Sequence, residues 1–99
     1  MFGQKRFKNG VYYDRKANAF IKIQGFGGGY YLCGHHCPFF SDALRQTAPD
    51  DQLSPDYIRD NCEIVGALDK ADYAEFEPIT LSWRVKERRY QRTAGQAHP

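Results

Sequence analysis

The chain has 99 residues, of which 41% are hydrophobic and 15% aromatic, so it has room for one core and is too apolar to be disordered throughout. It contains no run of about 18 apolar residues, and its basic first residues are not followed by an apolar stretch, which argues against a membrane span and a secretory signal. We expect a single compact domain over residues 1–92, a disordered tail over residues 93–99, no membrane partner and a cytoplasmic location.

The net charge of +2 hides a strong segregation of charge along the chain. Residues 1–16 and residues 84–92 each contain five basic residues and one acidic residue. Residues 41–77 contain ten acidic and three basic residues. This pattern predicts an electrically polar surface that would steer the protein toward charged partners.

A β-meander is expected over residues 11–33. The dipeptide Asn9-Gly10 suits a type I′ turn, which predicts a hairpin whose first arm lies in residues 1–8. In residues 19–24, Ala19, Ile21 and Ile23 then share one face and Lys22 and Gln24 the other, which is typical of a half-buried strand.

Two short helices are expected after the meander. Ser41 is followed by an acidic residue, which suits the start of a helix that ends before Pro49. Ser54 is followed by a proline, which favours a second helix from residue 55 to about Cys62. The apolar residues 64–68 are compatible with either a strand or the end of a helix.

Residues 79–86 alternate apolar and polar side chains and predict a C-terminal strand. The expected fold class is therefore α+β, with an antiparallel sheet of four or five strands, made of the meander and this last strand, and one or two short helices on one face. The expected core residues are Ile21, Ile23, Leu32, Leu44, Ile58, Leu81, Trp83 and Val85.

The cysteines and histidines offer two kinds of chemistry. Cys33, His35, His36 and Cys37 are close in sequence, and Cys62 could complete a zinc site. Three residues separate the first two cysteines, however, which is not the usual zinc spacing, and buried thiols in the core would explain the same residues. A cysteine nucleophile with a histidine base is a further alternative.

No motif with a known catalytic mechanism is present, so we expect no enzymatic activity and no cofactor. The glycine-rich residues 25–29 do not indicate a nucleotide-binding loop, because such loops open a helix and a strand is expected here. These glycines fit a hairpin loop instead.

The favoured function is a small protein-binding module or an inhibitor that covers a partner's surface. The main alternative is a nucleic-acid-binding domain with a basic and aromatic sheet face, and a small zinc domain is a weaker one. Self-association through an exposed edge strand is a variant of the first function. The predicted partner-binding residues are Tyr12, Tyr13, Tyr30, Asp50, Asp51, Asp56, Arg88 and Arg89.

Overall fold

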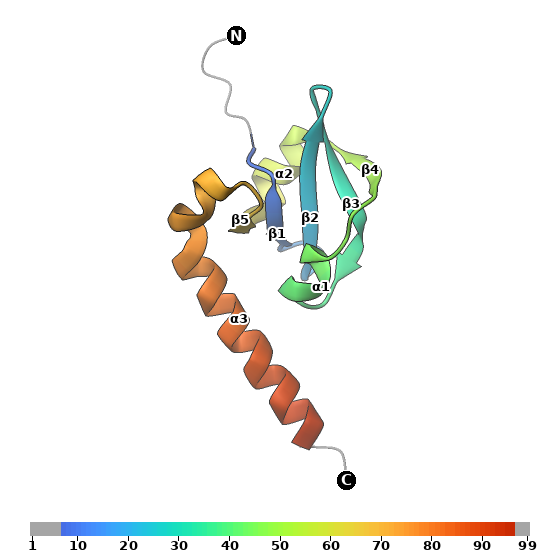
Figure 1. Ribbon diagram of the computed structural model, residues 1–99. Coiled ribbons are helices and arrows are strands. Elements are labelled where there is room, and N and C mark those ends of the chain that lie inside the picture. Colours follow the sequence, from blue (N-terminus) through green and yellow to red (C-terminus); the bar gives the residue numbers. More distant parts are fainter. Residues whose placement is uncertain (1–6, 97–99) are drawn as a thin grey trace.

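A computed structural model describes residues 7–96, with side chains up to residue 90. Five strands form one open antiparallel sheet in the order β4-β3-β2-β1-β5, which confirms the predicted α+β class (Figure 1). The elements in chain order are β1 (Gly10–Asp14), β2 (Ala19–Phe26), β3 (Gly29–Cys37), α1 (Phe40–Leu44), β4 (Pro49–Leu53), α2 (Pro55–Asn61), β5 (Cys62–Ala67), the 3-10 turn η1 (Lys70–Asp72) and α3 (Tyr73–Gln96).

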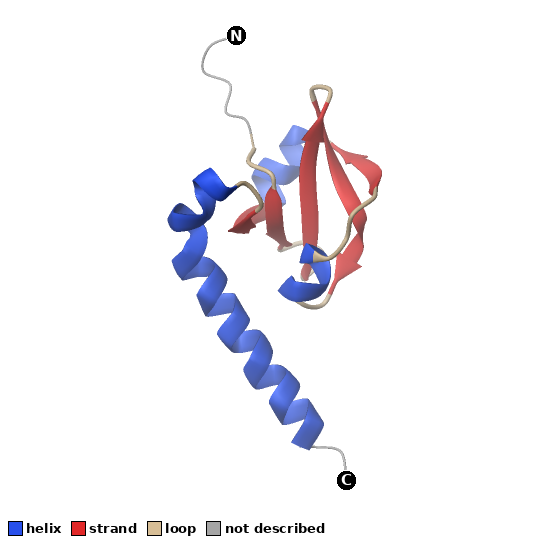
Figure 2. Cartoon of the chain, in the orientation of Figure 1, coloured by secondary structure: helices blue, strands red, loops and turns tan. Residues whose placement is uncertain are grey.

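Helices cover both faces of the sheet (Figure 2). On one face, Phe40 and Ala43 of α1 and Trp83 of α3 pack with the strand residues Val11, Phe20, Cys37 and Val65. On the other face, Ile58 of α2 packs with the strand residues Tyr12, Ile21, Ile23, Leu32 and Cys62. The sequence predicts both short helices on one face, whereas α1 and α2 lie on opposite faces.

The prediction of a strand over residues 79–86 is wrong, because this segment lies in the middle of α3. The alternating apolar positions also include pairs four residues apart, a spacing that a helix can present on one side. Of the predicted core residues, Leu81 and Val85 are exposed at 53% and 39%, while Trp83 packs against the sheet.

Two smaller expectations concern the ends of the chain. Residues 93–96, expected as a disordered tail, continue α3, and residues 97–99 lie outside the described part of the chain. The expected first hairpin arm falls mostly on residues 1–6, which also lie outside it, and residues 7–8 belong to no strand. The edge strand β4 had no signal in the sequence analysis.

The two short helices begin differently. α2 begins as predicted, since the Ser54 side chain accepts a hydrogen bond from the Tyr57 backbone and Pro55 fills the first turn. α1 begins one residue before Ser41, with Phe39 at the cap position and no side-chain cap. The Ser41 hydroxyl instead donates a hydrogen bond to the buried Glu87 of α3. The segment left open at residues 64–68 forms most of β5.

α3 is attached to the sheet through its middle turns. The Trp83 ring stacks on Tyr13 and meets Phe20 edge-on, with ring centroids 5.1 Å apart in both pairs. One turn earlier, the Thr80 hydroxyl donates a 2.6 Å hydrogen bond to the carbonyl of Val65, which lies at a bulge in β5. These contacts fix the direction in which α3 leaves the sheet.

We expect Trp83→Ala to lower the free energy of unfolding by about 3 kcal/mol, because it removes the ring that joins α3 to the sheet. Ile79→Ala is the matched control, since Ile79 lies on the same helix and is 41% exposed. The control should cost less than about 1 kcal/mol. Equal losses for the two variants in urea denaturation would contradict this account of α3 docking.

Candidate functional site

A groove of about 750 Å³ lies beside the β2–β3 hairpin. Its apolar surface comes from Phe7, Phe26, Tyr30 and Pro55. Its charged residues come from three segments. Lys8 precedes β1, Asp56 and Arg59 belong to α2, and Asp69 precedes η1. The described residues around this hollow thus combine aromatic rings with both signs of charge. We call this hollow the hairpin groove.

The hairpin loop exposes both backbone and an aromatic ring at the groove. Gly27 and Gly28 have φ angles of 54° and 88°, which side-chain-bearing residues adopt only rarely. Both lie in the two-residue turn of the hairpin, which confirms the predicted loop. Phe26, just before this turn, is 46% exposed and is close to Tyr31, with ring centroids 6.0 Å apart.

Hydrogen bonds and an aromatic contact hold the chain before β1 against the groove. The Phe7 backbone N–H donates to the Tyr30 hydroxyl at 3.0 Å, and the two rings meet edge-on with centroids 5.3 Å apart. The Tyr12 hydroxyl donates to the Lys8 carbonyl at 2.6 Å. The Lys8 ammonium also forms an ion pair with Asp72 at 3.0 Å. These contacts make the segment a fixed wall.

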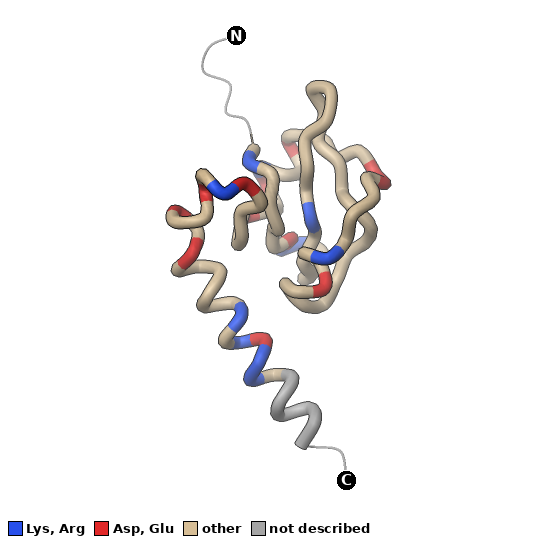
Figure 3. The backbone as a smooth tube through the Cα atoms, viewed as in Figure 1, with Lys and Arg blue, Asp and Glu red and all other residues tan. Residues whose placement is uncertain are grey.

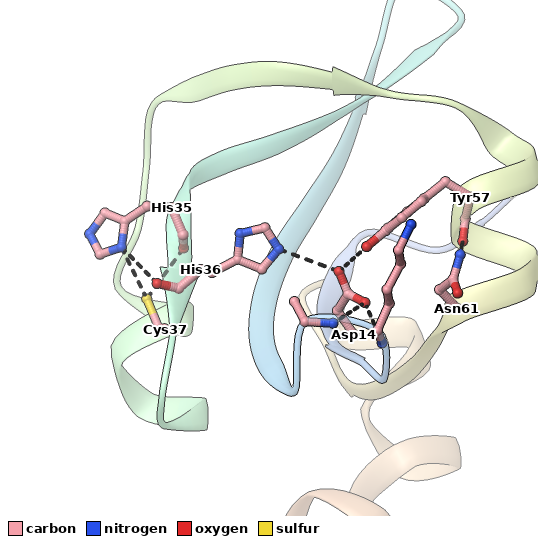
Figure 4. A network of polar contacts seen from close by, with 8 residues as sticks. Asp14, His35, His36, Cys37, Tyr57 and Asn61 are labelled. Atoms are coloured by element: carbon pink, nitrogen blue, oxygen red, sulfur yellow. Dashed lines mark hydrogen bonds and ion pairs between the residues drawn. The ribbon is translucent and has the colours of Figure 1, made fainter.

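The opposite wall is the start of α2, and the buried carboxylate of Asp14 fixes this helix (Figure 4). Asp14 Oδ2 accepts a 2.5 Å hydrogen bond from the Tyr57 hydroxyl and lies 3.3 Å from His36 Nε2. Its other oxygen accepts hydrogen bonds from the backbone N–H groups of Lys16 and Ala17 at 3.0 and 3.2 Å. One carboxylate therefore joins α2, β3 and the turn after β1.

This arrangement shifts two pKa values in opposite directions. Burial by itself would raise the pKa of Asp14, but the hydrogen bonds from Tyr57, the turn backbone and His36 outweigh it and lower the pKa below 3.8. The hydrogen bond to Asp14, with a smaller contribution from burial, raises the pKa of Tyr57 to about 12. The neutral phenol and the ionised carboxylate are thus the stable pair.

The eight predicted partner-binding residues do not form one surface. Tyr30 and Asp56 both line the hairpin groove. Tyr12 is 3% exposed and belongs to the core, and Tyr13 packs under Trp83. The remaining four are exposed elsewhere: Asp50 and Asp51 on the edge strand β4, and Arg88 and Arg89 on α3.

Most groove residues, Phe26 and Arg59 among them, are not among the partner-binding residues predicted from the sequence. Phe26 stands directly before the predicted glycine turn, and an aromatic residue at the tip of a hairpin has little to pack against. That position is the one signal that could have identified it.

The candidate metal ligands are divided between different environments. Cys33 donates to the Gln24 side chain at 3.1 Å, and Cys37 Sγ lies 3.8 Å from His35 Nδ1. His36 instead contacts Asp14, and Cys62 packs in the core on the α2 side. Within the described part of the chain, no group of three or more His, Cys, Asp or Glu side chains is arranged to hold a metal ion.

The thiols also lack the environment of a nucleophile. Cys33, Cys37 and Cys62 are all buried. Burial raises the pKa of each thiol, and that of Cys62 reaches about 12. A reactive cysteine needs a lowered pKa, so these thiols remain protonated at neutral pH.

Comparison of the chain with models of protein families, with curated proteins and with solved structures gives no match. None of the described helices has both the length and the apolar composition needed to cross a membrane.

We expect Tyr57→Phe to lower the free energy of unfolding by about 1.5–3 kcal/mol at neutral pH, because it removes a hydrogen bond to a buried charge. The lowered pKa of Asp14 means that this stabilisation is complete above pH 3.8 and disappears as the pH falls further and the folded protein takes up the proton. The difference between wild type and variant should therefore shrink in acid.

Denaturation of both proteins across an acidic pH series measures this difference. Tyr73→Phe is the control, since Tyr73 is 50% exposed, and it should match wild type at every pH. A Tyr57→Phe defect that stays constant down to the acid limit would show that the hydrogen bond to ionised Asp14 is not its cause.

Proposed function

We propose that the protein is a non-catalytic binding module that holds a segment of a partner protein in the hairpin groove. The observation that carries the proposal is the combination of exposed aromatic surface with a charge-balanced rim in one hollow of about 750 Å³. Aromatic residues contribute much of the binding energy at protein interfaces, while polar rims supply orientation. A module of this kind would act by covering its partner, as an inhibitor does.

The rigidity of the walls supports the proposal. Phe7 and Lys8 are held by Tyr30, Tyr12 and Asp72 on one side, and α2 is held by Asp14 on the other. A preformed groove loses little conformational entropy when a ligand enters it, which favours affinity. Phe26 on the hairpin is the groove's exposed large hydrophobic side chain.

The charges around the groove favour a protein over a nucleic acid. Asp56 and Asp69 would repel phosphates, and the guanidinium of Arg59 is already paired with Asp56 at 3.0 Å and Asp60 at 3.2 Å. The alternative of a nucleic acid on a face of the sheet has less support, because helices cover both faces: Tyr12 is buried and Tyr13 packs against α3. Lys22 is likewise bound to the carbonyls of Leu44 and Gln46.

The proposal predicts that peptides selected from a random display library on the immobilised protein bind in the groove. Phe26→Ala should weaken the best peptide by about 10- to 100-fold, as expected for loss of an aromatic hot spot. Calorimetry measures the affinity. Tyr90→Ala is the matched control, because Tyr90 is 64% exposed on α3, outside the groove, and it should leave binding unchanged.

Backbone amide shifts in a titration of the labelled protein locate the peptide. The proposal requires the largest changes at residues 25–30 and 55–59. Shifts confined to β4 or α3, or equal effects of the two alanine variants, would reject the groove as the binding site.

A further inference from the structure

The outward side of α3 carries opposite charges at its two ends. Glu75 and Glu77 are exposed in the first two turns, and Arg88 and Arg89 are exposed further along. Figure 3 shows the acidic residues at the start of α3 and the basic residues in its second half. Among the side chains that the structure describes, none of these four forms an ion pair. These four residues therefore present two unneutralised charges of each sign, and the exposed Arg84 and Lys86 add positive charge between them.

Between these charged ends lies an apolar patch. Leu81 and Val85 are four residues apart, so they share one side of the helix, and they are exposed at 53% and 39%. Thr80 and Glu87 contact β5 and α1 from the other side of the helix. Leu81 also borders a hollow that α3 forms with α1 and the end of β5. The patch is therefore open to solvent at the flank of the helix, and α3 lies along the outer boundary of the molecule in Figure 1.

We propose that this side of α3 binds a second copy of the chain in an antiparallel helix pair. A two-fold axis near Ser82 would bring the apolar patches of the two copies together. The same operation would place the acidic end of each helix opposite the basic end of the other. A surface that is complementary to itself under a two-fold rotation is what a symmetric dimer requires.

The spacing along the helix fits this arrangement. Glu75 lies seven residues before Ser82 and Arg89 seven residues after it, which corresponds to about 10.5 Å in each direction at 1.5 Å per residue. Glu77 and Arg88 are similarly placed, five residues before Ser82 and six residues after it. In a single antiparallel register, the glutamates of each helix therefore lie opposite the arginines of the other helix at both ends of the pair.

A second copy explains both the charges and the patch, whereas an acidic or basic partner would match one end of α3 and be repelled by the other. Nucleic acid in particular would gain from Arg88 and Arg89 but would meet Glu75 and Glu77 along the same side. A contact through one helix per copy is small, so the dimer should form in the micromolar to millimolar range. The pairing does not involve the hairpin groove and stands independently of its function.

Charge reversal gives a sharp test of the pairing. Sedimentation of the wild-type protein over a micromolar to millimolar series should show a monomer–dimer equilibrium that weakens with added salt. One variant carries Glu75→Arg and Glu77→Arg, and a second carries Arg88→Glu and Arg89→Glu. Each variant alone should be monomeric, because like charges then face each other at both ends.

Mixing the two variants should restore the dimer as a heterodimer, since both ends become complementary again. This rescue separates the pairing from simple misfolding of either variant. A wild type that stays monomeric up to millimolar concentration would overturn the proposal. So would variants that dimerise alone, or a wild-type monomer whose Arg88 and Arg89 bind labelled RNA or DNA instead.

A disulfide probe tests the position of the axis. Leu81→Cys should form an intermolecular disulfide under mild oxidation, because this position lies in the apolar patch and its two copies would meet beside the axis. Gln52→Cys, exposed on β4 at the far edge of the sheet, is the control. The native thiols are buried and should not interfere. Equal cross-linking at the two positions would contradict the antiparallel register.

Discussion

The carboxylate of Asp14 is the constraint on which most of the structure depends. It is fully buried at the end of β1, where an ion would be costly without partners. Its partners come from three separate parts of the chain: the turn after β1, β3 and α2. Because Tyr57 connects it to α2, the same group also determines where one wall of the hairpin groove lies. The hydrogen bonds of a buried carboxylate therefore determine the shape of a groove on the surface.

Much of the sheet could be predicted from local signals, and the reason is physical. Ile21 and Ile23 alternate with the polar Lys22 and Gln24, and the glycines after them permit a tight turn. Ser54 with Pro55 is a local signal for the start of a helix. For residues 79–86, the local sequence pattern is not enough to distinguish a strand from a helix. Their alternation is compatible with a strand and with a helix, and the contacts of Trp83 and Thr80 with the sheet, which are long-range, favour the helix.

The candidate site was less predictable than the fold. Tyr30 and Asp56 were identified from aromaticity and charge, but the groove joins them to Phe7 and Phe26 through the pairing of distant segments. Tyr12 has the same side chain as Tyr30 and is buried, because it lies on the sheet face that α2 covers. Residue type alone therefore could not separate the tyrosines of the core from those of the surface.

The contact between Thr80 and Val65 has a consequence for how the two edges of the sheet behave. Exposed edge strands invite other strands to add to them, which leads to aggregation. At β5 a bulge interrupts the regular hydrogen-bonding ladder, and the Thr80 hydroxyl of α3 donates a hydrogen bond to the carbonyl of Val65 at this bulge. At the other edge, β4 begins with a proline and two aspartates, which also resist strand addition. Both edges of the sheet are thus protected against the addition of a further strand.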